Sequence, residues 1–325
     1  MSILSKAYFH DEAAAFAHVE TILWADGRVC PHCGTVDNST HLKGVRTKPS
    51  RKNPEGVERH GLYKCKDCRK QFTVRKGTIF EESHLPMHKW LQAIYLMASS
   101  KKGFSAHQMH RVLEVQYRTA WFLCHRIREA MRTGGPLEPF GGGGGDVEVD
   151  ETFIGKDKEA NPTGKRTAPW EEANKILTLV DRQRGQAYSV VIKDLKSATI
   201  LPIVQENVEY ETRILTDEAR RLRPVGGKFH THKRVNHSQN EYVNLEDRTI
   251  HTNTVEGYFS IFKRGMKGVY QHCSSKHLHR YLAEYDFRYN NRSANGIEDG
   301  ERAVRALMGF KGKRLTYRTA HKERL

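Results

Sequence analysis

The chain has 325 residues, enough for about two or three domains with a sizeable core. Its formal net charge of +16 favours a polyanionic partner, because neutralising phosphates releases counterions from nucleic acid. Mean hydropathy is −0.70 and no apolar run approaches the ~20 residues that span a bilayer, so we expect no membrane partner. Residues 1–10 lack the basic start and apolar centre of a secretory signal, which predicts a cytoplasmic, nucleoid-associated protein.

Two Cys-X-X-Cys pairs follow an expected helix at residues 11–23. The pairs comprise Cys30, Cys33, Cys65 and Cys68. In an intracellular protein this spacing favours one tetrahedral zinc ion over disulfides, because two sulfurs separated by two residues can grip the same ion. A thiol redox pair is the alternative. We expect structural Zn²⁺ on four thiolates of a zinc ribbon that runs from Cys30 to about Phe80.

Helical spacing of apolar residues predicts helices over 86–99, 105–113 and 117–132, the last two joined by a tight turn. Such a pair suits a helix-turn-helix, whose second helix enters a major groove. The second helix carries Arg118 and Arg126, which we expect to bind DNA. Because helix pairs also occur in ordinary cores, packing is the alternative interpretation.

The glycine-rich stretch 134–146 is a low-complexity segment, and it predicts a linker. After it, the pattern predicts three strands, a helix, a strand ending at Asp217, a helix, a short strand and a helix that carries Glu256. This is the order of a ribonuclease-H-like α/β fold. The expected domains are residues 1–80 (helix and zinc ribbon), 81–133 (helix-turn-helix-like DNA-binding region), 134–146 (linker), 147–295 (ribonuclease-H-like domain) and 296–325 (C-terminal helix and basic tail).

Carboxylates occupy three elements of the expected ribonuclease-H-like domain. Asp150 lies in an alternating apolar and acidic strand, Asp217 ends a later strand, and Glu256 lies in the first turn of a helix. A solvated edge strand is the structural alternative for Asp150, since charged residues are normally exposed. Three carboxylates from separate elements can instead hold two Mg²⁺ or Mn²⁺ ions, which take oxygen ligands. Two such ions about 3.5–4 Å apart clamp the attacking and leaving oxygens of a phosphoryl transfer.

These residues resemble the transposases of the IS1595 (ISXO2-like) insertion sequences, which are related to Merlin elements. The resemblance spans nearly the whole chain. It depends on the segments 24–27, 30–34, 149–152, 216–218, 235–238, 251–257, 263–265 and 288–292, whereas Tyr258 and Phe259 stand where the family often has a tryptophan. The resemblance implies a DDE-type transposase, a Mg²⁺-dependent enzyme that cleaves DNA at the ends of its element and joins the freed 3′ hydroxyl to target DNA. Asp150 and Asp217 match the first two acids of that family.

The third acidic position is open between two residues. Some members of the family are described with Asn in this role, and Asn253 and Glu256 lie three residues apart on one helix face. A carboxylate binds Mg²⁺ better than an amide, which favours Glu256, whereas Asn253 as N-cap with Glu256 at N3 would make a capping box. Lys263 lies two helical turns beyond Glu256, where its ammonium can reach a DNA phosphate, and the family has a lysine there. Arg264 beside it is a further expected DNA contact.

The resemblance predicts an insertion-sequence transposase that binds terminal inverted repeats through the zinc ribbon and the helix pair. Bringing two DNA ends together implies at least a dimer in the active complex. A domesticated regulator, which binds DNA without cutting it, is one alternative. A metal-dependent nuclease that hydrolyses without joining is another, and only its products would separate it from a transposase.

Overall fold

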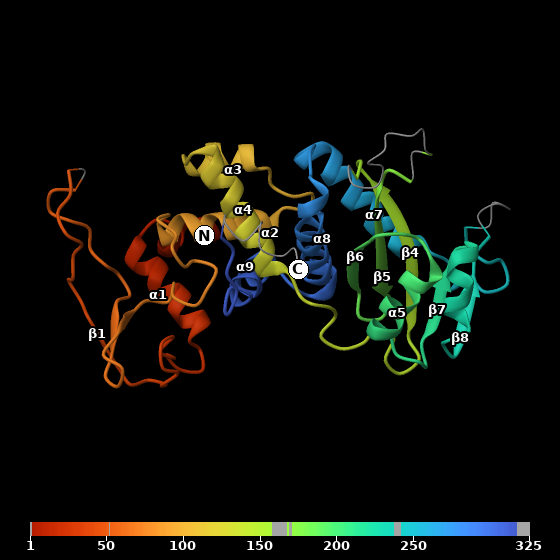
Figure 1. Cartoon of the computed structure of the whole chain (residues 1–325), viewed down its shortest axis with the longest axis horizontal. Helices are drawn as coiled ribbons and strands as arrows, with labels where there is room; N and C mark the ends of the chain where they lie inside the picture. Colours follow the sequence, from red (N-terminus) through yellow and green to blue (C-terminus); the bar gives the residue numbers. More distant parts are fainter. Residues whose placement is uncertain (1, 52, 158–167, 169–170, 237–241, 317–325) are drawn as a thin grey trace. The chain divides into compact units, whose positions relative to one another are not determined.

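The computed structural model describes residues 2–51, 53–157, 168, 171–236 and 242–316, which form two compact units (Figure 1). The first unit comprises Met1–Ser100, Phe104–Met131 and Glu298–Leu325, and the second comprises Lys101–Gly103 and Arg132–Ile297. Residues 237 and 238, which contribute to the resemblance, and residues 317–325 of the expected basic tail lie outside the described residues. None of the helices in the described ranges has the length and apolar composition needed to cross a bilayer.

The first unit is built mainly from helices. They are η1 (Ile3–Ser5), η2 (Ala7–Phe9), α1 (Glu12–Leu23), α2 (Met87–Ser99), α3 (Ala106–Leu113), α4 (Tyr117–Met131) and α9 (Asp299–Met308). Helix α9 packs against α1, α2 and α4 although it is distant from them in sequence. Its Arg302 is buried and donates from Nη1 to Ala98 O at 3.1 Å. The C-terminal segment, expected as a separate part, therefore belongs to the helical core of this unit.

A small antiparallel sheet lies between α1 and α2 in the sequence. Its strands, in spatial order, are β1 (Ser39–His41), β2 (Tyr63–Cys65) and β3 (Gln71–Phe72). The rings of Trp24, Tyr63 and Phe72 pack together beside the cysteines. A sheet this small buries little apolar area, so it is the kind of module that a bound metal normally stabilises.

The second unit contains a five-stranded sheet in the order β6-β5-β4-β7-β8. Its strands are β4 (Asp146–Ile154), β5 (Asn174–Asp181), β6 (Gln186–Ile192), β7 (Arg213–Thr216) and β8 (Thr231–Arg234). Strands β4, β5 and β6 form an antiparallel meander. Strand β7 runs parallel to β4, and β8 runs parallel to β7. This mixed sheet confirms the expected ribonuclease-H-like fold class.

Helices cover both faces of this sheet (Figure 1). Those on one side are α5 (Ser197–Asn207), η3 (Arg220–Leu222) and α6 (Arg223–Gly226). Later in the chain come α7 (Asn253–Gly265), the π-helical turn η5 (Met266–Tyr270), α8 (Ser275–Asn290) and the turn η6 (Ser293–Asn295). Val147 and Val149 of β4 pack into the cluster that includes α5. Because side chains alternate along a strand, Glu148 and Asp150 face the opposite side, where α7 carries Glu256.

The glycine-rich segment is part of the second unit and is packed where it approaches the sheet. Phe140 is 1% exposed, and Gly141 donates its N–H to the buried Asp181 carboxylate at 2.9 Å. Gly141 has a φ of +76°, and a Cβ at this position would lie 2.1 Å from Thr212 Oγ1. This glycine is therefore required by a left-handed backbone and a close approach, and not by linker flexibility.

A buried carboxylate links α8 to β6 and to α7. Asp286 accepts hydrogen bonds from Ser189 N, Ser189 Oγ and Tyr258 OH at 2.8, 2.8 and 2.5 Å. Burial raises the pKa of Asp286 to about 7, and these three hydrogen bonds oppose the shift. The ordinary pKa of this carboxyl group, in the unfolded chain, is 3.8. Between pH 3.8 and about 7 the folded protein therefore keeps a proton on Asp286 that the unfolded chain has lost.

The stability of the protein should therefore fall as pH rises from about 4 to about 7 through this group. We expect a slope of up to about 1.4 kcal/mol of unfolding free energy per pH unit, and the Asp286→Asn variant should lose that slope. Denaturant unfolding across this pH range measures it, with the exposed Glu206→Gln as the matched control. An unchanged slope in Asp286→Asn would contradict the prediction.

Candidate active site and zinc centre

Two neighbouring parallel strands bring acidic residues together in the second unit. Strand β7 pairs with the first residues of β4 and ends at Thr216. Carboxylate oxygens of Asp150, Glu151 and Asp217 lie within 4.8 Å of one another. The Asp217 carboxylate is oriented by Ala219 N, which donates to Oδ1 at 3.0 Å. The structure thus unites the first two predicted acids and adds Glu151 to them.

Asp150 lies in a strongly negative environment. Its pKa is raised to about 8, first by burial and then by the negative charges of Asp217 and Glu256. The positive charges of Arg221 and Lys263 oppose the shift. A divalent cation with oxygen ligands would relieve this repulsion. These oxygen donors therefore fit Mg²⁺ or Mn²⁺. The negative charge of Glu256 acts on Asp150 together with that of Asp217.

Glu151 and Arg221 are residues of this site that the sequence did not single out. Glu151 is 9% exposed and forms an ion pair with Arg221. Its Oε2 atom has no hydrogen-bond partner among the described residues, which is costly for a buried carboxylate unless a cation lies beside it. Neighbours on a strand normally face opposite sides, so the strand period gave no signal for Glu151 beside Asp150.

The start of α7 is held by a fully buried carboxylate of β4. Glu148 Oε2 accepts a hydrogen bond from Val255 N at 2.7 Å, and Oε1 accepts from Arg182 Nε at 2.6 Å. Arg182 also donates to His251 O at 2.6 Å, which ties the segment before α7 to the same strand. The Glu148 side chain therefore satisfies a free N–H of the first helical turn and fixes where α7 begins.

The expected capping box at the start of α7 is not formed. The N-cap is Thr252, and Asn253 is the first helical residue. Thr252 Oγ1 donates to Glu256 Oε1 at 2.9 Å. The interpretation of Asn253 as N-cap is therefore wrong, because the strand carboxylate already binds the helix start. Asn253 and Glu256 are both exposed.

The two basic residues near the end of α7 differ in their surroundings. Lys263 is half-buried, and its positive charge opposes the rise in the pKa of Asp150. Arg264 is exposed and donates to the Ser260 carbonyl and hydroxyl oxygens at 3.1 and 2.8 Å. The charges of Glu256 and Lys263 on helix α7 thus both act on Asp150, whereas the Arg264 guanidinium binds its own helix.

The helix pair α3 and α4 forms as predicted, but much of its basic surface is turned inward. Arg126 is 5% exposed and donates from Nη2 to Glu81 O at 2.5 Å. Arg128 is buried as well. Arg126, expected to bind DNA, is therefore buried against the core and not exposed on the outer face of α4. Arg118, in the first turn, is exposed.

The four cysteines of the ribbon converge on one point. Their sulfurs lie within 4.8 Å of one another. Cys30 Sγ lies 3.7 Å from Cys68 Sγ, and Cys33 Sγ lies 3.6 Å from Cys65 Sγ. Tetrahedral zinc with bonds of about 2.3 Å places its sulfur ligands about 3.8 Å apart, so this spacing fits one ion. The predicted zinc-ribbon arrangement is confirmed.

Comparison with known proteins follows the same division. Residues 143–290 match the ISXO2-like transposase domain of the IS1595 family, and residues 10–71 match the transposase zinc-ribbon domain of that family. An uncharacterized protein in transposable element ISH50 of Halobacterium salinarum is 25% identical over 299 residues, covering 86% of this chain and 91% of that protein. An uncharacterized transposase-like protein of Haemophilus influenzae is 27% identical over 106 residues, covering 33% of this chain and 82% of that protein.

A chain in the cryoEM structure of the simian T-cell lymphotropic virus intasome, in complex with PP2A regulatory subunit B56 gamma, is 12% identical with a TM-score of 0.27. The match covers 61% of this chain and 65% of that chain. The two domain matches agree with the converging cysteines and with the ribonuclease-H-like sheet, and the chain belongs to the IS1595 family of ISXO2-like transposases.

Proposed function

We propose that this transposase cleaves DNA at the ends of its insertion sequence and joins the freed 3′ hydroxyl to target DNA. The observation that carries the proposal is the convergence of Asp150 and Asp217, whose carboxylate oxygens lie within 4.8 Å, beside the charge of Glu256. These residues would hold divalent cations. Mg²⁺ or Mn²⁺ bound there would activate the attacking oxygen and stabilise the leaving oxygen of an in-line phosphoryl transfer.

The chain's own residues position the DNA around this chemistry. Lys263, whose charge acts on Asp150, would bind a phosphate oxygen of the strand being cut. Glu148 and Arg182 hold the start of α7, so the distance of Glu256 from the aspartates is set by buried contacts. Of the two candidates for the third ligand, Glu256 is favoured because its charge already acts on Asp150.

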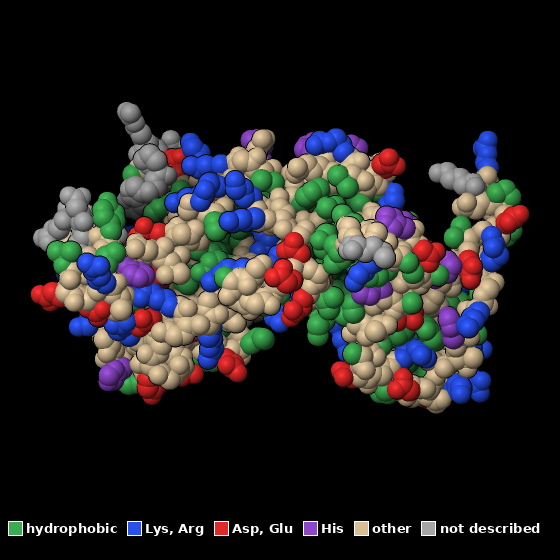
Figure 2. Space-filling view, turned by 180° about the vertical axis from the view of Figure 1, so that it is seen from behind, with side chains coloured by type: hydrophobic (Ala, Val, Ile, Leu, Met, Phe, Trp, Pro, Cys, Tyr) green, Lys and Arg blue, Asp and Glu red, His purple; other side chains and the backbone are tan. Residues whose placement is uncertain are grey.

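The proposed partner is double-stranded DNA, as element ends and as target. The net charge of +16 supports this partner, and Figure 2 shows Lys and Arg side chains on the visible face of each unit, interspersed with Asp and Glu. The zinc ribbon and the exposed first turn of α4 with Arg118 are the proposed recognition elements. Joining two ends requires at least two active sites, so a homo-oligomer would act, in the cytoplasm at the nucleoid.

The test is strand cleavage and joining on labelled DNA that carries the ends of the element. We expect Mg²⁺-dependent products from the wild type, and a loss of roughly 10²–10³-fold or more in Asp150→Asn, Asp217→Asn and Glu256→Gln. Asn253→Ala should keep most of the activity. The exposed Glu206→Gln, on α5 outside the acidic cluster, is the matched control and should behave as wild type.

The same assay contains the results that would overturn the proposal. Ends that are bound but never cut would favour a DNA-binding regulator. Cleavage without joining would favour a nuclease. If Asn253→Ala abolishes activity while Glu256→Gln keeps it, the third ligand is the amide, and the assignment of Glu256 fails while the transposase reaction stands.

A further inference from the structure

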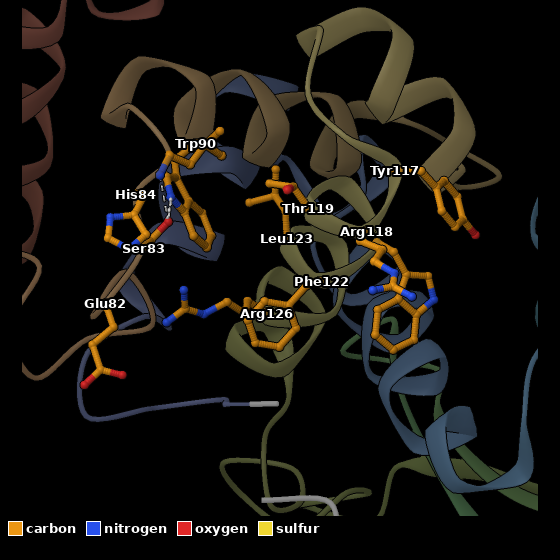
Figure 3. A pocket seen from close by; sticks show the side chains of 12 residues that line it. Glu82, Ser83, His84, Trp90, Tyr117, Arg118, Thr119, Phe122, Leu123 and Arg126 are labelled. Atoms are coloured by element: carbon orange, nitrogen blue, oxygen red, sulfur yellow. Dashed lines mark hydrogen bonds between the residues drawn. The ribbon is translucent and has the colours of Figure 1, made fainter. Parts of the chain in front are cut away.

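The first unit contains a cavity of about 830 Å³ that the proposed phosphoryl transfer does not use (Figure 3). It lies between the segment that leads into α2 and one side of α4. Its walls include Trp90, Tyr117, Arg118, Trp121, Phe122 and Arg126. This volume is within the range of pockets that hold small molecules, and the mixture of aromatic rings with guanidinium groups limits what could fill it.

The aromatic walls differ in how firmly they are held. Trp90 is 1% exposed and donates from Nε1 to Ser83 Oγ at 3.0 Å, so its indole is fixed in one orientation. Trp121 and Phe122 are half-buried, and Tyr117 is 41% exposed. The cavity thus offers planar apolar surfaces from its floor to its rim. Flat aromatic surfaces of this kind favour a planar ligand that can stack on them.

Arg126 provides a buried cation with an unused hydrogen-bond donor. Its guanidinium carbon lies 5.5 and 5.4 Å from the ring centroids of Trp90 and Phe122. Nη2 donates to Glu81 O, but Nε has no hydrogen-bond partner among the described residues. Figure 3 shows this guanidinium between Glu82 and Trp90 at the cavity. A buried N–H without a partner is costly, and a ligand with an acceptor atom would satisfy it.

The acids near this arginine are already occupied. Glu81 pairs with Lys76 at 2.6 Å, and Glu82 pairs with Arg314 at 2.8 Å. Within the described part of the chain, no carboxylate forms an ion pair with Arg126. Cations therefore outnumber the acids around the cavity. The ligand that fits it best is an anion or a ring with several hydrogen-bond acceptors.

We propose that this cavity binds an unpaired, extrahelical nucleotide of DNA. The base would stack on the aromatic walls, and an acceptor of the base or of its phosphate would bind the Arg126 guanidinium. Tyr117 and Arg118 line the cavity from the first turn of α4, which is the turn that a helix-turn-helix presents to base edges. A nucleotide extruded beside that helix would therefore find the cavity next to it. The inference depends on the proposed function for its DNA partner.

The test uses the full chain with zinc and two duplexes of the same sequence. One duplex carries a single extrahelical 2-aminopurine, and in the other this base is paired. We expect the extrahelical duplex to bind about tenfold more tightly, within the range of one base stacked on aromatic side chains, and its fluorescence to be quenched on binding. Equal affinity for the two duplexes in the wild type would overturn the inference.

Substitutions in the cavity test whether its residues cause the preference for the extrahelical base. Trp121→Leu should lose the preference for the extrahelical base while affinity for the paired duplex changes less than about twofold, and Tyr117→Leu should lower the ratio of the two affinities. Tyr210→Leu, which replaces an exposed tyrosine of the second unit, should keep the preference. Thermal unfolding shows whether each variant folds, and the rim position of Tyr117 keeps the test valid if Trp121→Leu is unstable. Preference unchanged in both cavity variants would contradict the assignment.

The outcomes separate this inference from the proposed function. Binding of paired DNA without any preference for the extrahelical base removes the inference alone. Absence of binding to either duplex removes the DNA partner and the proposed function with it. If sedimentation shows that Trp121→Leu changes the oligomeric state while the base preference persists, the cavity is a docking site for a second copy and the nucleotide assignment is wrong.

Discussion

The Cys65→Ser variant is expected to lose zinc and, with it, the fold of the segment from Cys30 to Phe72. Cys65 is fully buried in β2, where it lies 3.6 Å from Cys33 Sγ. The three short strands offer few apolar contacts of their own, so the ion is expected to supply most of their stability. Structural zinc in small modules contributes an apparent 10–16 kcal/mol or so near neutral pH, which exceeds the stability of an ordinary domain.

The loss of zinc is measured by the zinc content of the Cys65→Ser protein, and the loss of the ribbon fold is measured by amide hydrogen exchange. Protection should vanish in the ribbon and persist in β4 and β5 of the second unit. A strong chelator should have the same effect on the wild type. Cys273→Ser, a half-buried cysteine outside the ribbon, is the matched control and should keep both zinc and protection. A Cys65→Ser protein with full zinc content and a protected ribbon would show that the ion is not held by these thiolates.

The Glu148→Ala variant is expected to lose up to about 3–5 kcal/mol of unfolding free energy, because it removes the fully buried partner of Arg182 and leaves this cation only its longer ion pair with Asp146. The change also removes the acceptor of Val255 N at the start of α7. Helix α7 would then shift relative to β4 and carry Glu256 with it. A displacement of about 1 Å at a reacting group can cost roughly 10²-fold in rate, so DNA strand transfer should fall as well.

Two variants separate stability from positioning at this residue. Glu148→Gln retains an oxygen acceptor and the side-chain volume, so it should be less destabilised than Glu148→Ala. Denaturant unfolding gives the free energies, and strand transfer at a temperature where both variants are folded gives the activities. Glu206→Gln again controls for the loss of a carboxylate on the surface. Wild-type stability in Glu148→Ala would show that the buried carboxylate does not hold α7.

Several features of the catalytic unit could be predicted from local pattern. The alternation of apolar and acidic residues around Asp150 is a property of one strand, and it placed the carboxylate on one face without knowledge of any neighbour. The cysteine spacing likewise fixes a ribbon, because ligand geometry within each pair is local. The order of strands and helices was sufficient for the fold class, since few topologies join them with short connections.

Other features required the folded chain. The roles of Glu148, Glu151 and Arg221 depend on contacts between segments distant in sequence, and no local period distinguishes a buried paired acid from an exposed one. The alternative interpretation of Asn253 as N-cap is wrong, because the N-cap is Thr252 and a carboxylate from β4 accepts from the first helical turn. The charge of Arg126 predicted a DNA contact, but only the packing of α4 shows that its side chain is buried and lines a cavity.

The sequence by itself determined the class of this protein: its charge, its cysteine pairs and its acidic strand all follow from residues close together in the chain. Only the tertiary structure decided which acids meet, what holds the start of α7 and where a cavity remains. The physical reason is that carboxylate repulsion, buried ion pairs and aromatic packing act over a few ångströms between segments that can lie a hundred residues apart, as Glu148 and Val255 do.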